Sequence, residues 1–178
     1  METAPNDLAF PAGLAEAAKI GFEWDEETSD SPDVDWEFYA QFEAPEETAW
    51  WFRLWTGNDD VDGSQFRFFG TTGAGDYAGF WLIRPGAPLT EQPIIYISSE
   101  TDRGVVARNL GDLLWIFANG AGPAEAFKYT NMETKPNEAF RAIAERYAPG
   151  MSRSTVELVD AAQDEFPEFP ELIESMCQ

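Results

Sequence analysis

The 178-residue chain has no histidine, one cysteine and few lysines. Without histidine it lacks the commonest general base, the commonest zinc ligand and every catalytic triad that uses an imidazole. The single cysteine, Cys177, has no second cysteine for an intramolecular disulfide, so nothing suggests an oxidising compartment. These absences exclude most familiar hydrolase mechanisms, and they direct the search for function toward surfaces and partners.

Long uncharged apolar stretches are also missing. The main one runs from Leu113 to Ala124 and has twelve residues, well short of the roughly 20 that a membrane helix needs. The amino-terminal residues show no basic region followed by an apolar core, so we expect no secretory signal. The sequence therefore predicts a cytoplasmic protein that does not enter a membrane.

The chain is nevertheless rich in core-forming residues. Hydrophobic residues make up 44% of it, with seven Trp and fourteen Phe. A chain of this length and composition can bury a sizeable core. We expect one domain over residues 1–178, with an acidic approach (1–44), a central signature region (45–127) and C-terminal helices (128–178).

The formal net charge of −22 is unevenly distributed. Residues 1–64 hold 17 acids and two bases, residues 65–149 nine acids and eight bases, and residues 150–178 seven acids and one base. Such a field repels nucleic acid and anionic membranes and steers basic partners toward the protein. We therefore expect no nucleic-acid binding. The same charge would also serve solubility alone, or adaptation to a salty environment.

Before residue 65 the pattern predicts two helices separated by a loop. Leu8–Ile20 has a weak helical pattern. The composition of residues 21–35 favours a loop that could include one edge strand. A better helix runs from Pro45 to Thr56, with Glu46 and Glu47 in its first turn. Two pairs of apolar residues share faces of this helix: Trp51 with Trp55, and Trp50 with Leu54.

The central region predicts a sheet followed by a helix. Its expected strands are Gln65–Phe69, Tyr77–Ile83, Gln92–Ser98 and a short Val105–Ala107. Asn109 then stands as the N-cap of a helix that Gly120 ends. Trp115 and Ile116 lie off the apolar stripe of that helix, so we expect it to be buried on two sides.

Two further helices and a short final segment are expected near the carboxyl terminus. One helix begins at Pro136 and is stopped by Pro149 and Gly150. Ser154 and Glu157 form a capping-box pattern for the next helix. Pro167 and Pro170 then leave only a short final segment.

Three local patterns could each indicate either a chemical function or only a structural role. Residues 70–75 are glycine-rich but lack the Gly-Lys-Ser/Thr ending of a phosphate loop, which favours a tight turn. Residues 58–64 match part of a calcium loop, but position twelve is Phe69 rather than the bidentate glutamate. Glu100 and Asp102 could form a carboxylate pair for acid–base chemistry, although neighbouring acids are ordinary in a polar loop. We accordingly predict no catalytic residue, no metal site and no cofactor.

An ordered series of short motifs gives the chain a family resemblance. The series is Trp55-Thr56-Gly57-Asn58, Phe69-Gly70, Gly73-Ala74-Gly75, Phe80-Trp81-Leu82, Gln92-Pro93-Ile94-Ile95-Tyr96, Ser98-Ser99-Glu100, Val105-Val106-Ala107 and Leu113-Leu114-Trp115-Ile116-Phe117-Ala118-Asn119-Gly120. In this order the motifs resemble the SUKH superfamily, which includes the yeast cell-wall regulators of the Smi/Knr type. The resemblance covers roughly residues 45–127, and the chain departs from the family pattern at Thr71-Thr72 and at Thr101-Asp102.

The resemblance implies a fold and a function. The implied fold is an α+β domain in which helices pack around a mainly antiparallel sheet of about four to six strands, in agreement with the residue pattern. Bacterial members resemble immunity proteins of polymorphic toxin systems, each of which binds a cognate toxin directly, often a basic nuclease. We therefore expect the partner to be a basic toxin protein. The acidic flanks suit that role, because carboxylates can imitate a phosphate backbone and speed the encounter.

The residues expected to contact a partner are acids that the pattern leaves exposed. They are Asp25, Glu26 and Glu27, then Asp59, Asp60 and Asp62. Two further acids and a base, Glu100, Asp102 and Arg103, are the second choice. Each of them could instead be an ordinary solvated residue.

Three classes of function remain open from the sequence. An immunity protein would bind one toxin tightly and show no activity alone. A regulatory binding module, as in the yeast relatives, would bind several partners more weakly. An enzyme would have to use carboxylates or a bound metal, and the lack of histidine makes this the third choice.

Overall fold

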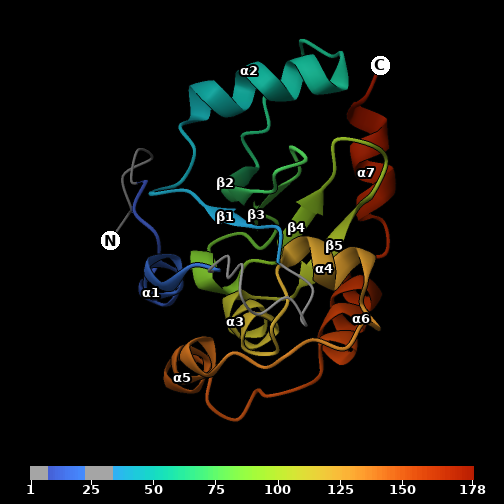
Figure 1. Ribbon diagram of the computed structural model, residues 1–178. Helices are drawn as coiled ribbons and strands as arrows, with labels where there is room; N and C mark the ends of the chain where they lie inside the picture. Colours follow the sequence, from blue (N-terminus) through green and yellow to red (C-terminus); the bar gives the residue numbers. More distant parts are fainter. Residues whose placement is uncertain (1–7, 23–33) are drawn as a thin grey trace.

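A five-stranded antiparallel sheet lies at the centre of the computed structural model, which describes residues 8–22 and 34–178 (Figure 1). The strands are β1 (Glu37–Phe38), β2 (Phe66–Thr71), β3 (Tyr77–Trp81), β4 (Ile94–Ile97) and β5 (Arg103–Ala107). They follow one another across the sheet in chain order, each antiparallel to the next. Turns join β2 to β3 and β4 to β5, as antiparallel neighbours allow.

Helices cover both faces of this sheet (Figure 1). They are α1 (Ala12–Ile20), α2 (Pro45–Thr56), α3 (Leu110–Ala118), α4 (Pro123–Lys128), α5 (Glu138–Tyr147), α6 (Thr155–Glu165) and α7 (Phe169–Met176), with a 3-10 turn at Leu89–Glu91. Tyr96 of β4 lies in the core formed with α1, α3 and α5, whereas its neighbour Ile95 lies in a second core formed with α2 and α7. Burial on both faces explains why the strands are apolar runs rather than alternating patterns. The expected α+β class with a mainly antiparallel sheet is confirmed.

Several helix ends lie where their capping residues predict. Helix α2 has the predicted bounds, Pro45–Thr56. Before α3, the side-chain oxygen of Asn109 accepts a hydrogen bond of 2.8 Å from the backbone N–H of Asp112. The capping box of α6 is present, with Ser154 and Glu157 each accepting from the other's backbone N–H. These ends were predictable because each depends on a few neighbouring residues.

Helix α3 occupies the middle of the larger core. Every residue from Asp112 to Ala118 is buried, so the expected burial on two sides is confirmed. The indole N–H of Trp115 donates a hydrogen bond of 2.8 Å to the carbonyl oxygen of Ala148, which satisfies its only polar group. The most apolar part of the signature region is therefore a structural core.

The prediction and the structure differ in several places, and three of these differences have a clear cause or limit. Helix α4 has only six residues and was not predicted, because so short a segment shows no helical period. Helix α5 begins at Glu138 rather than at Pro136, because Asn137 caps it. The edge strand is β1, just beyond the stretch of 21–35 in which one was expected, and residues 23–33 of that stretch lie outside the described residues. No helix in the described ranges is long and apolar enough to span a bilayer.

Candidate partner-binding surface

One part of each acidic flank of the sequence lies at a shared corner of the molecule. The backbone N–H of Gln178 donates a hydrogen bond of 2.9 Å to the carbonyl oxygen of Thr56, at the end of α2. The side-chain amide of Asn58 donates another of 2.9 Å to the carbonyl oxygen of Met176, at the end of α7. In Figure 1 the red helix α7 accordingly leads to a C-terminus beside the end of α2. We call residues 45–64 and 166–178 the α2–α7 corner.

The α2–α7 corner carries an excess of exposed acids. They are Glu46, Glu47, Asp59, Asp60, Asp62, Glu168, Glu171 and Glu174. Arg53 is the only base in these two segments, and its charge acts on Asp62. The bonds of Asn58 and Gln178 thus place the end of α7 beside the loop of Asp59, Asp60 and Asp62, so that acidic segments more than 100 positions apart in the chain are neighbours.

The predicted contacts Asp59, Asp60 and Asp62 lie in a loop that its own hydrogen bonds hold in place. The backbone N–H of Asp60 donates to Asn58 Oδ1 at 2.9 Å, and the backbone N–H of Ser64 donates to Asp62 Oδ1 at 3.0 Å. The bond from Ser64 is the main cause that keeps the pKa of Asp62 below its ordinary value. The loop therefore displays exposed carboxylates on a fixed backbone, which reduces the entropy lost on binding.

The same loop was the partial match to a calcium site. The side chain of Asn58, at the first ligand position, is engaged with Asp60 and Met176 within the protein. Among the residues that the structure describes, no group of three or more acidic or cysteine side chains is arranged to hold a metal ion.

The tryptophans of helix α2 differ in burial, because some pack against the sheet and one is exposed to solvent. Trp51 stacks on Tyr77 with ring centroids 4.2 Å apart, and its indole N–H donates to Glu43 Oε1. Trp50 and Leu54 point away from the sheet, and each is 72% exposed. They line a hollow of about 480 Å³ together with Glu46, Arg53, Gly57 and Asp59. The corner therefore combines apolar side chains with its acids.

The second-choice residues divide between two places. The backbone N–H groups of Glu100 and Asp102 both donate to Ser98 Oγ, which fixes the turn between β4 and β5 and leaves both carboxylates exposed. Arg103 turns toward the α2–α7 corner, where its guanidinium lies 5.8 Å from the ring centre of Trp55 and 3.9 Å from the sulfur of Cys177. The first-choice residues Asp25, Glu26 and Glu27 lie outside the described residues.

A buried carboxylate was not found by the sequence analysis. Asp76 follows the glycine-rich turn between β2 and β3, and it accepts hydrogen bonds from the hydroxyl of Tyr96 and from the backbone N–H of Ser99, the latter at 2.8 Å. The ammonium of Lys128 lies 3.5 Å from the same carboxylate. Burial acts to raise the pKa of Asp76, but these donors and the charge of Lys128 outweigh it and hold the pKa below its ordinary value. This network ties two turns to α4, so its role is structural.

A second buried acid lies on α4. Glu125 Oε1 accepts a hydrogen bond of 2.7 Å from the backbone N–H of Asp35, and the carboxylate of Asp35 accepts one of 2.8 Å from the N–H of Gly73. Burial raises the pKa of Glu125. Asp35 thereby joins α4 to the glycine-rich turn. Gly70 and Thr71 are the last residues of β2, and the chain turns after them to enter β3 at Tyr77, so the expected tight turn between two strands is present but begins after Thr71.

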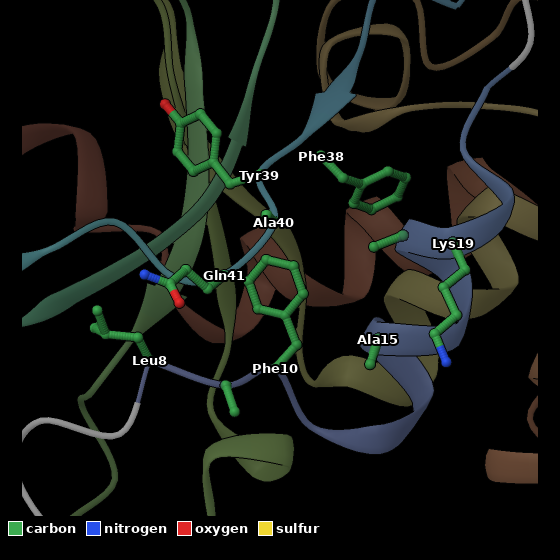
Figure 2. Close-up of a pocket in the computed structure, with 10 residues that line it drawn as sticks. Leu8, Phe10, Ala15, Lys19, Phe38, Tyr39, Ala40 and Gln41 are labelled. Atoms are coloured by element: carbon green, nitrogen blue, oxygen red, sulfur yellow. The ribbon is translucent and has the colours of Figure 1, made fainter.

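A larger hollow lies elsewhere, between α1 and the extended chain of β1 (Figure 2). It has a volume of about 810 Å³ and a mainly apolar lining that includes Phe10 and Phe38. Lys19 carries the only charge among the described lining residues. This hollow is therefore separate in character from the acidic corner.

Comparison of the chain with protein-family models, curated proteins and solved structures finds no match. The SUKH resemblance accordingly stays a prediction from the motifs.

Proposed function

We propose that this protein is an immunity protein of the cytoplasm, which neutralises a cognate basic toxin by binding it directly. The α2–α7 corner carries this proposal, because it joins acidic segments of the two flanks that are far apart in the sequence. A rigid concentration of carboxylates raises the rate at which a basic protein arrives and favours the correct orientation. If the toxin is a nuclease, the same carboxylates occupy the basic surface that its nucleic-acid substrate needs.

Co-expression with the product of the adjacent gene tests the proposal directly. We expect that product to be toxic alone, harmless when this protein is present, and recovered with it as a one-to-one complex. A catalytically inactive version of the same product should still bind, because the proposed mechanism is occlusion. If neighbouring products are neither toxic nor bound, the proposal is wrong.

Charge reversal within the corner should slow association with the toxin. The variant Asp59→Lys/Asp60→Lys/Asp62→Lys should lower the association rate constant by about tenfold or more at low salt. It should also make that rate less dependent on salt, because fewer charges steer the encounter. Stopped-flow mixing over a series of salt concentrations measures both effects.

A control variant separates local charge from net charge. Glu133, Glu138 and Asp160 are exposed acids outside the corner, and replacing all three with lysine changes the net charge by the same amount. This variant should associate nearly as fast as the wild type. Equal slowing of the two triple variants would mean that net charge alone steers the partner.

A further inference from the structure

The outward side of α2 has an unusual order of side chains. Glu46, Trp50 and Leu54 are spaced four residues apart, so they form one stripe along the helix. Trp50 and Leu54 are the most exposed large apolar side chains among the described residues, at 72% each against 60% for Tyr129. A tryptophan at the middle of a charged surface is the typical anchor of a protein interface.

Acids stand at both ends of this apolar pair. Glu46 and Glu47 begin the helix, and Asp59 and Asp60 follow its last turn. The hollow beside the stripe runs between these ends, since its lining includes both Glu46 and Asp59. The order along the helix axis is therefore acidic, apolar, acidic, over about 18 Å for a twelve-residue helix.

A second copy of the chain is a poor occupant of this surface. If two α2 helices paired antiparallel, Glu46 and Glu47 of one copy would face Asp59 and Asp60 of the other. If they paired parallel, each acidic end would face itself. Both arrangements place like charges opposite each other, and such pairs cost free energy when water is excluded. The surface instead complements an element with cations at its ends.

We propose that the outward side of α2 binds an amphipathic helix of the basic partner, with apolar side chains against Trp50 and Leu54 and a lysine or arginine at each end. This inference rests on the proposed function and names the part of the toxin that docks. A helix fits because the stripe from Glu46 to Leu54 is a ridge of side chains four residues apart, and such ridges pack into the grooves of a second helix. A partner helix of about three turns matches the length of α2.

A synthetic peptide tests this proposal without knowledge of the toxin. The probe is a fluorescently labelled helical peptide of about 18 residues, in which arginines about 12 residues apart flank one Leu/Ala stripe, to match the length of α2. The control peptide has the same composition in a permuted order that removes the stripe. Fluorescence anisotropy at physiological salt should show binding of the probe and about tenfold or more weaker binding of the permuted peptide.

Matched variants of the protein locate the contact. Trp50→Ala/Leu54→Ala should weaken binding of the probe by about tenfold or more, with an unchanged circular dichroism spectrum because both side chains are exposed. Leu82→Ala/Ile83→Ala removes another exposed pair, 42% and 41% accessible, and should leave binding unchanged. Equal binding of the two peptides, no binding of either, or full binding by Trp50→Ala/Leu54→Ala overturns the proposal. So does a dimer, seen by sedimentation, that this double variant abolishes.

The co-expression experiment separates failure of this inference from failure of the proposed function. If the toxin is neutralised equally by the wild type and by Trp50→Ala/Leu54→Ala, the immunity function stands and the α2 docking site is wrong. If no toxin is neutralised, the immunity function fails, and the peptide measurements still decide whether α2 binds a basic helix.

Discussion

Replacing Asp76 with alanine is expected to lower the free energy of unfolding by about 3–5 kcal/mol. The change removes a buried acceptor, so the hydroxyl of Tyr96 and the backbone N–H of Ser99 lose the carboxylate to which they donate hydrogen bonds. It also removes the carboxylate near the partly exposed ammonium of Lys128. Urea unfolding followed by tryptophan fluorescence measures the loss. The change in free energy should be large because the network joins the two turns at this end of the sheet to α4.

An exposed acid at the same end of the sheet provides the control. Asp102 lies in the turn between β4 and β5, with an exposed side chain and backbone hydrogen bonds that an alanine keeps. Asp102→Ala should therefore cost less than about 1 kcal/mol. If Asp76→Ala and Asp102→Ala destabilise the protein equally, the buried network does not hold this end together.

The effect at Asp76 should also depend on pH. The pKa of Asp76 is held below its ordinary value of 3.8 in the folded protein, so ionised Asp76 stabilises the fold above that value and loses the effect as the pH falls through the lowered pKa. Asp76→Asn has no such titration. The difference in unfolding free energy between the wild type and Asp76→Asn should be constant near neutral pH and shrink below about pH 4. A gap that stays constant down to pH 2 would contradict the assigned ionisation.

Much of the fold followed from local sequence. The bounds of α2 and the cap of α3 each depend on residues within one turn, such as Pro45 and Asn109. The strands from β2 to β5 followed from apolar runs bounded by turn residues. Helix α4 was missed because its six residues show no helical period, and its position depends on contacts of Glu125 with Asp35 and of Lys128 with Asp76, which are distant in the chain.

The candidate surface was predictable only in part. The exposure of Asp59 and Asp60 followed from their place in a polar loop. The contact between α2 and the C-terminus could not be predicted from the sequence. It depends on two hydrogen bonds, from Asn58 to Met176 and from Gln178 to Thr56, and each joins residues more than 100 positions apart. The sequence did contain a signal for the exposed pair Trp50 and Leu54. The helix has apolar residues on two faces, and a helix at the edge of a core can bury only one of them, here the face of Trp51. Asp76 gave no local signal, because an aspartate after glycines is ordinary in a turn.

Replacing Gly120 with alanine is expected to destabilise the fold by about 3–5 kcal/mol, for two separate reasons. Its φ of +91° lies in the region that residues with a β-carbon rarely adopt. A β-carbon there would also lie 2.0 Å from the backbone oxygen of Lys135, in a segment that crosses the end of α3. That segment cannot move freely, because the backbone N–H of Asn137 donates to the carbonyl oxygen of Ala118 at 2.9 Å. The unfolding midpoint in urea should fall accordingly.

Gly150 separates the two causes of this loss. Its φ is +77°, but a β-carbon added there would meet nothing within 4 Å. Gly150→Ala should therefore show only the conformational cost of about 1–2 kcal/mol, and the excess loss in Gly120→Ala measures the clash with Lys135. If both variants lose the same free energy, the chain after α3 can relax around a methyl group and does not pack rigidly on the helix end. An excess of about 2 kcal/mol or more would show that this glycine is required for the close approach as well as for the turn.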